Sequence, residues 1–200
     1  MKNHKLFPFL LLGLLVMGTN GQAAAADILD YTTPEKLSDQ LFDYTFTFDG
    51  DLYQLPLPVS ALMENGWEPD EKSDQTVASG EYGWCYLLKD NEELRCMVDN
   101  FGSEEAGIAD CYITDIEAFI YDCNVEMTIA GGITIGMGSE ELLLALEGIS
   151  YETDDDSESF TYYLIADPDE EYGEIEIMVD KETGLVCGIE VEFYPEEFIG

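Results

Sequence analysis

Two short acidic segments carry the side chains best suited to holding a cation. Residues 154–158 read Asp-Asp-Asp-Ser-Glu, and residues 167–171 read Asp-Pro-Asp-Glu-Glu. Spaced carboxylates are the ligands that Ca²⁺ prefers, but neither segment has the glycine and terminal glutamate of a complete calcium-binding loop. We therefore predict that both are solvated loops and that the chain has no dedicated metal site.

A pair of carboxylates can also carry out the acid–base steps of glycoside hydrolysis. The sequence has 44 Asp and Glu residues, so some pair must lie close together by chance, and no position stands out as catalytic. A two-carboxylate hydrolase or an extracellular carbohydrate-binding protein is therefore the alternative to the binding function predicted below.

Histidine chemistry is excluded from the rest of the chain. His4 is the only histidine, and it lies in an N-terminal segment that we expect to be removed. Without it, Ser-His-Asp and Cys-His catalysis and histidine-ligated metals are ruled out. The five cysteines also lack a Cys-x-x-Cys redox motif. We predict a protein that is not an enzyme, with no catalytic residues and no cofactor.

The cysteines are predicted to be structural. Residues 82–88 and 93–99 alternate as the two strands of a hairpin, and a register centred on Asp90-Asn91 places Cys85 opposite Cys96. We expect a disulfide between these two residues in an exported chain. Cys187 is expected to be a buried thiol, and a second bridge between Cys111 and Cys123 stays open.

The same hairpin predicts a candidate binding surface. Cys85, Leu87 and Leu94 share the face assigned to the core, so the opposite face carries Tyr82, Trp84, Tyr86, Arg95 and Met97. A sheet wetted on one side would ordinarily carry polar residues there. Either another part of the chain covers this stripe, or the stripe is exposed and binds a partner. In the second case these five residues are the partner-binding site.

The first 26 residues have the features of a secretory signal peptide. Lys2 and Lys5 precede an apolar run from Leu6 to Met17, and a series of small residues ends at Ala26. The run is too short for a stable membrane span, so cleavage near Ala26 would yield a secreted protein. Five basic residues then remain against 44 acidic ones, a net charge of −39. That charge repels nucleic acid and favours a basic protein partner.

An internal repeat is predicted from spacing. Residues 46–54 match residues 127–135 at an offset of 81, and the same offset carries Met97-Val-Asp99 onto Met178-Val-Asp180. A constant offset over separate segments is typical of duplication. We divide the chain into a signal peptide (1–26), a lead-in (27–43), a first repeat (44–119) and a second repeat (125–200).

Each predicted repeat combines a β-hairpin, a short helix and antiparallel strands. Asp49-Gly50 is a hairpin turn between alternating strands, and Pro58 and Gly66 bound the first helix. Residues 174–180 and 185–193 alternate with glutamates on the outer face. These elements predict an α+β fold of two tandem repeats, in which the strands form a sheet and the helices pack on one face.

One segment also resembles a known family. The run Ile133-Thr-Ile-Gly136-Met137-Gly138-Ser139, followed by Leu142–Leu146 and Gly148, resembles the helix entry of the β-lactamase inhibitor protein-like superfamily. That superfamily includes a secreted inhibitor with two tandem repeats whose helices pack on a shared curved sheet. The resemblance implies the same architecture and a role in binding other proteins. The sequence thus predicts a secreted, acidic, non-catalytic protein-binding module.

Overall fold

The computed structural model describes Leu29 and residues 31–198. The signal peptide predicted over residues 1–26 and its cleavage near Ala26 lie outside this part of the chain. Within it, no helix is both long enough and apolar enough to cross a membrane.

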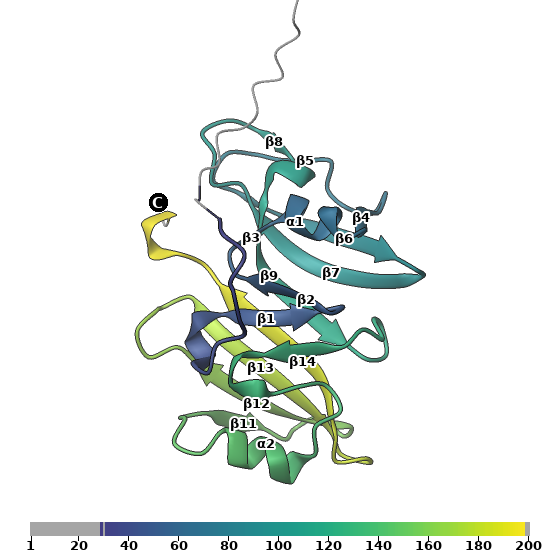
Figure 1. Cartoon of the computed structure of the whole chain (residues 1–200), viewed down its shortest axis with the longest axis vertical. Helices are drawn as coiled ribbons and strands as arrows, with labels where there is room; N and C mark the ends of the chain where they lie inside the picture. Colours follow the sequence, from purple (N-terminus) through teal and green to yellow (C-terminus); the bar gives the residue numbers. More distant parts are fainter. Residues whose placement is uncertain (1–28, 30, 199–200) are drawn as a thin grey trace, which may run out of the picture.

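One antiparallel sheet of nine strands forms the frame of the molecule (Figure 1). Eight strands follow one another in the order β11–β12–β13–β14–β9–β7–β6–β4, and β3 pairs with the first residues of β9. Their bounds in chain order are β3 (Leu57–Pro58), β4 (Glu68–Pro69), β6 (Tyr82–Lys89), β7 (Glu92–Asp99), β9 (Tyr112–Phe119), β11 (Glu152–Asp154), β12 (Phe160–Ala166), β13 (Gly173–Asp180) and β14 (Val186–Phe193).

A smaller sheet and two short helices lie on one side of this frame. In Figure 1 the small sheet crosses the middle of the large one, with one helix toward each end. The small sheet consists of β1 (Thr45–Phe48), β2 (Asp51–Gln54) and β10 (Met127–Ile129), and the helices are α1 (Val59–Glu64) and α2 (Ser139–Ala145). The remaining elements are the pair β5 (Thr76–Val77) and β8 (Ala106–Gly107) and the single-turn 3₁₀ helices η1 (Leu41–Asp43), η2 (Ile108–Asp110), η3 (Ala130–Gly132) and η4 (Glu196–Phe198).

The main core forms between the two sheets. Phe46 and Phe48 of β1 are completely buried, and the Phe48 ring lies 5.2 Å from the Trp67 ring. The large sheet contributes alternate residues of β13 and β14 to the same core, among them Ile177 and Ile189. Because successive strand residues point to opposite faces, this alternation leaves the intervening residues of β13 and β14 on the other, open face.

The predicted α+β class is wrong, because the fold is mostly β. Strand residues make up 43% of the structure and helical residues 14%, and the two α-helices have only six and seven residues. The first strands of the two predicted repeats pair with each other, with Phe46 opposite Ile129 and Phe48 opposite Met127. The small sheet that results occupies the central part of the face that the prediction gave to the helices. Most of the core therefore lies between sheets rather than under helices.

The same order of elements occurs twice along the chain. A strand of the small sheet, a helix, a short edge strand and three long strands appear first as β1, α1, β4, β6, β7 and β9, and then as β10, α2, β11, β12, β13 and β14. The starts of β7 and β13, Glu92 and Gly173, are 81 residues apart, which is the predicted offset. The last strands of the two halves, β9 and β14, pair directly. Both halves thus share one sheet, and the boundaries at 44–119 and 125–200 stay a prediction.

The predicted turns are confirmed. Asp49 and Gly50 between β1 and β2 both have positive φ, and so do Asp90 and Asn91 between β6 and β7. Two successive residues in this region form the tight hairpin turn whose twist matches that of the flanking strands. The second turn sets the predicted register, in which Cys85 lies opposite Cys96.

Candidate functional site

The predicted aromatic stripe lies on the open face of the large sheet. Tyr82 and Trp84 on β6 are 62% and 39% exposed, Tyr86 is half-buried, and Arg95 and Met97 lie opposite Tyr86 and Trp84 on β7. No described segment covers Tyr82 or Trp84 as the small sheet covers the other face. Within the described residues these two side chains are therefore not hidden, and their role in binding stays a prediction.

The outer edge of β6 is held by a loop that follows β4. The Ser73 hydroxyl accepts a hydrogen bond from the Tyr86 amide at 2.9 Å and donates one to the Tyr86 carbonyl at 3.0 Å. The Asp74 carboxylate accepts a hydrogen bond from the Trp84 amide at 2.8 Å. These contacts satisfy backbone groups that an edge strand would otherwise expose, and they fix the strand that carries the aromatic residues.

Six carboxylates continue the stripe across the next three strands, and we call them the carboxylate array. Glu117 on β9 lies opposite Arg95, and beyond it come Glu190 on β14 and Glu176 on β13. In the neighbouring row Asp115 lies opposite Met97, and beyond it come Glu192 and Glu174. Two parallel rows thus run from the aromatic side chains of β6 to the carboxylates of β13.

The array is electrostatically strained. Burial raises the pKa of Asp115, and the adjacent Glu192 raises it further. Burial also raises the pKa of Glu190, with added repulsion from Asp115 and Glu117, and the side chains of Asp115 and Glu190 share a hydrogen bond. Like charges opposed across neighbouring strands destabilise a sheet, so this surface favours either a proton or an external cation.

Arg95 is the single basic residue in the two rows. Its guanidinium lies 3.0 Å from the Glu117 carboxylate and 5.2 Å from the centre of the Trp84 ring. One side chain of the protein thus already shows how this face holds a cation, between an aromatic ring and a carboxylate.

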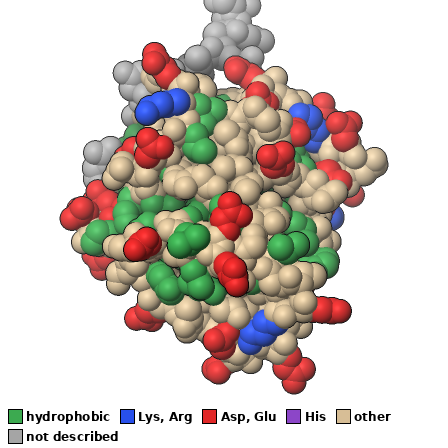
Figure 2. Space-filling view, turned by 60° about the horizontal axis from the view of Figure 1, so that its bottom comes forward, with side chains coloured by type: hydrophobic (Ala, Val, Ile, Leu, Met, Phe, Trp, Pro, Cys, Tyr) green, Lys and Arg blue, Asp and Glu red, His purple; other side chains and the backbone are tan. Residues whose placement is uncertain are grey.

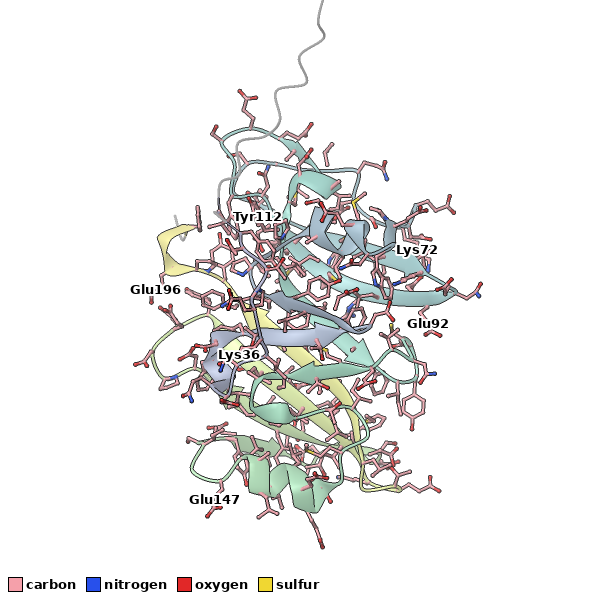
Figure 3. All side chains as sticks on the ribbon, viewed as in Figure 1. Lys36, Lys72, Glu92, Tyr112, Glu147 and Glu196 are labelled. Atoms are coloured by element: carbon pink, nitrogen blue, oxygen red, sulfur yellow. The ribbon has the colours of Figure 1, made fainter. Side chains whose placement is uncertain are left out.

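The other basic side chains leave little positive charge for the array. Four of the five in the described part form ion pairs: Lys72 with Glu93, Lys89 with Asp49, Arg95 with Glu117 and Lys181 with Asp155. The fifth basic residue, Lys36, lies well away from Lys72 (Figure 3). At the end of the molecule that carries α2, Figure 2 shows acidic side chains scattered among apolar ones with few basic ones between them. Among the described residues, acidic side chains therefore greatly outnumber basic ones, and Arg95 is the basic residue that contacts the array.

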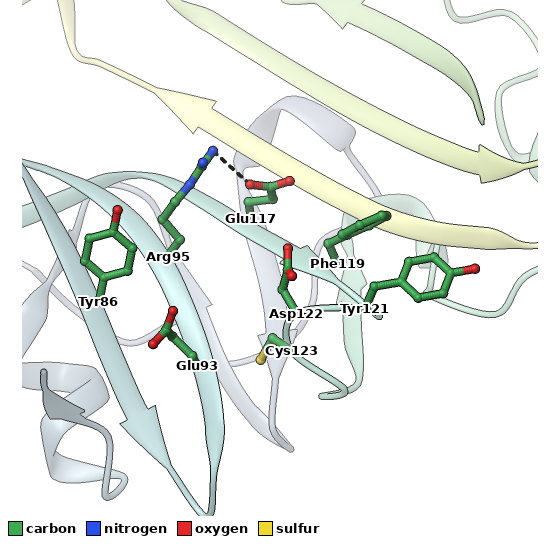
Figure 4. A pocket seen from close by; sticks show the side chains of 8 residues that line it. All are labelled: Tyr86, Glu93, Arg95, Glu117, Phe119, Tyr121, Asp122 and Cys123. Carbon is green, nitrogen blue, oxygen red and sulfur yellow. Dashed lines mark ion pairs between the residues drawn. The ribbon is translucent and has the colours of Figure 1, made fainter. Parts of the chain in front are cut away.

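A pocket of about 400 Å³ opens beside Arg95 (Figure 4). Its aromatic walls are Tyr86, Phe119 and Tyr121, and its carboxylates are Glu93, Glu117 and Asp122; Arg95 and the buried Cys123 complete it. The Tyr121 ring meets the Phe119 ring edge-on at 5.1 Å, and its hydroxyl donates a hydrogen bond to Asp180 at 3.2 Å. Tyr121 is 61% exposed and is nevertheless held in place.

The predicted disulfide is not formed. Cys85 and Cys96 are opposite each other as predicted, but both are free thiols, as are Cys111, Cys123 and Cys187. Directly opposed Cβ atoms in an antiparallel pair lie about 4.5–5.5 Å apart, whereas a disulfide draws them to roughly 3.8 Å. Opposite positions in the strand register are therefore not sufficient for a disulfide bond. The expected burial of Cys187 is confirmed.

The two acidic segments considered for calcium have structural partners instead. Asp167 accepts hydrogen bonds from the Tyr44 hydroxyl at 2.5 Å and from the Asp169 amide at 2.9 Å, and Asp155 accepts one from Thr161 at 2.6 Å. Among residues 29 and 31–198, no group of three acidic, cysteine or histidine side chains is placed to hold a metal ion.

Sequence reasoning found one part of this site and missed another. It placed the five stripe residues and turned Glu174, Glu176, Glu190 and Glu192 outward, but it did not identify Asp115, Glu117, Phe119, Tyr121 or Asp122. The signal for Asp115 and Glu117 was present, because both alternate with the apolar residues of β9, where Ile116 and Ala118 are buried. Tyr121 and Asp122 lie in a turn after β9 and had no such pattern.

Comparison with known proteins gives no further identification. No protein-family model matches the chain, and neither the curated proteins nor the solved structures yield a match. The resemblance to the β-lactamase inhibitor protein-like superfamily therefore stays a prediction, and the function has to be argued from the site.

Proposed function

We propose that this protein is a secreted, non-catalytic binding module that captures a basic protein partner on the open face of its large sheet. The observation that carries the proposal is the continuity of the two rows, from Tyr86 and Trp84 on β6 to six carboxylates on β9, β14 and β13. Tyrosine and tryptophan are common anchors at protein interfaces, and surrounding charge steers the partner and sets its orientation.

The charge balance supports a basic partner. A cationic side chain placed over the array would relieve the repulsion between its carboxylates, which Arg95 alone offsets among the described residues. The net charge of −37 adds long-range attraction for any basic protein. The signal peptide predicted at the N-terminus would bring this surface into contact with extracellular partners.

The alternative of a two-carboxylate hydrolase is less well supported. The carboxyl groups of a glycoside hydrolase stand about 5–9.5 Å apart, so that a sugar and a water molecule fit between them. The most perturbed pair on this face, Asp115 and Glu190, is in direct hydrogen-bond contact instead. That geometry fits a shared proton better than two separate catalytic roles.

The test is a selection of short peptides on the purified protein from a random display library, followed by affinity measurement on the selected sequences. We expect them to carry net positive charge, and we expect Trp84→Leu to weaken their binding by about tenfold, the loss typical of an interface anchor. Trp84 is partly exposed, so the melting temperature should change by no more than about 2 °C. Since Trp67 is buried and the chain has two tryptophans, quenching or a shift of the exposed Trp84 emission also reports contact.

Leu144→Ala is the matched control. Leu144 is a 72% exposed apolar residue on α2, whose buried Leu142 faces the core side of the sheet. Binding should be unchanged in this variant. If selected peptides lose affinity for the Leu144→Ala protein and retain it for the Trp84→Leu protein, the binding surface is not the open face and the proposal is wrong.

A further inference from the structure

The pocket beside Arg95 has the composition of a site for an organic cation. Aromatic rings attract cations through their faces, and carboxylates supply the opposite charge. Tyr121 contributes an exposed ring that the Phe119 ring and the Asp180 carboxylate hold in position. A fixed wall of this kind loses little conformational entropy when a ligand binds.

One carboxylate of the pocket, that of Asp122, has no partner among the described residues. Glu117 pairs with Arg95 and Glu93 pairs with Lys72, so the charges of both are partly offset. The side chain of Asp122, by contrast, makes no hydrogen bond or ion pair within the part of the chain that the structure describes. The pocket thus presents an open negative charge next to an aromatic wall.

The protein displays the same arrangement filled by its own side chain. Arg95 lies between the Trp84 ring and the Glu117 carboxylate, on the rim of the pocket (Figure 4). The pocket also contains a further ring, that of Tyr121, and a further carboxylate, that of Asp122, and neither is paired with a basic side chain in the part of the chain that the structure describes. The volume of about 400 Å³ is at the small end of the range for ligand pockets, roughly 300–1,000 Å³, and suits one side chain.

We propose that this pocket receives one arginine or lysine side chain of the protein partner, with Tyr121 contacting the cationic group and Asp122 neutralising its charge. The inference rests on the proposed function. It specifies where on the open face a basic residue of the partner binds. It also divides the face into two parts: Tyr82 and Trp84 supply apolar contact, and the pocket supplies selectivity for a positive charge.

The experiment compares two probes that differ only in charge. One is the fluorescently labelled peptide acetyl-Gly-Tyr-Arg-Tyr-Gly-amide, and the other has citrulline, a neutral isostere, in place of arginine. At low salt we expect the purified protein to prefer the arginine peptide by about fivefold to tenfold, as one cation–π contact and one ion pair would give. Asp122→Asn and Tyr121→Leu should each reduce this preference to about twofold or less.

Tyr82→Leu is the matched control, because Tyr82 is 62% exposed against 61% for Tyr121 and lies on the same face outside the pocket. It should weaken both peptides equally and leave the preference for arginine intact. Melting temperatures of all three variants should match that of the parent protein, since none of the altered side chains is buried.

The possible outcomes distinguish a failure of the pocket assignment from a failure of the proposed binding face. If Trp84→Leu weakens both peptides while Asp122→Asn and Tyr121→Leu leave the arginine preference unchanged, the binding face stands and the pocket assignment is wrong. If free ethylguanidinium binds and the arginine peptide does not, the pocket takes a small free cation and the assignment to a partner side chain is wrong. If the selected basic peptides are insensitive to Trp84→Leu, the proposed function itself fails.

Discussion

Burial decides the chemistry of the five cysteines. Each is at most 1% exposed, and burial raises the pKa of Cys85 and Cys187 to about 11 and that of Cys111 and Cys123 to about 12. The thiolate is the reactive form of cysteine, and it is scarce at neutral pH when the pKa is this high. At the scale of single residues, these side chains behave as small apolar groups of the core.

A thiol titration tests this assignment. The native protein should react slowly with a thiol reagent at pH 7.5, and the protein denatured without reductant should titrate five thiols. Global unfolding is needed because the sulfurs lie inside the packed core. A count of three thiols in the denatured protein would instead show that a disulfide forms, with Cys85 and Cys96 the first pair to examine by peptide mapping.

At the scale of elements, the carboxylate array couples three strands through their charges. Asp115 and Glu117 on β9 face Glu192 and Glu190 on β14, and Glu174 and Glu176 on β13 continue the rows. Only Arg95 on β7 compensates this charge from the neighbouring strand. Because the strands must stay together for the core to form, folding holds these like charges close and shifts their protonation.

We therefore predict that acidification stabilises the protein. Burial and neighbouring acids raise the pKa of Glu190 to about 8 in the folded state, against 4.5 ordinarily. The folded state then binds the proton more tightly than the unfolded state, so this stabilisation is greatest below pH 4.5 and is lost as the pH rises toward 8. The melting temperature should be higher at pH 5.5 than at pH 8.5, by about 5 °C or more.

Glu190→Gln identifies the source of that pH dependence. Removing the charge should raise the melting temperature at pH 8.5 and have little effect at pH 5.5. The melting temperature would then depend less on pH. Glu158→Gln, at an exposed position outside the array, should leave this pH dependence unchanged. Equal destabilisation by Glu190→Gln at both pH values would show that the array does not titrate in this window.

At the scale of the whole molecule, the charge is almost all of one sign. The chain carries 44 acidic and seven basic residues, and four of the five basic side chains in the described part are already in ion pairs. Repulsion of this kind keeps a protein soluble and monomeric but opposes the compact state. The same excess attracts a basic partner from a distance.

Salt should therefore act in opposite directions on folding and on binding. Raising NaCl from 10 to 100 mM shortens the screening length from roughly 30 Å to 10 Å. We expect the melting temperature to rise by a few degrees and the affinity for the selected basic peptides to fall severalfold. A melting temperature that falls with salt would contradict net repulsion, and salt-independent binding would contradict an electrostatic contribution from the array.

What the sequence determined by itself was local. Asp49-Gly50 and Asp90-Asn91 specify tight turns because their backbones tolerate positive φ, and the second turn then fixes the register of β6 and β7 and the face on which Tyr82 and Trp84 stand. Alternation in β13 and β14 likewise predicted which glutamates point outward. Each of these features depends on residues that are neighbours in the chain.

Only the tertiary structure decided which strands lie side by side. The pairing of β1 with β10 made the fold mostly β, and the pairing of β9 with β14 brought Asp115 and Glu117 beside Glu192 and Glu190. Alternation tells which face a residue occupies but not which strand will be its neighbour, because that choice follows from how the whole apolar surface is buried at once. The carboxylate array and the pocket at Tyr121 and Asp122 therefore exist only in the folded protein.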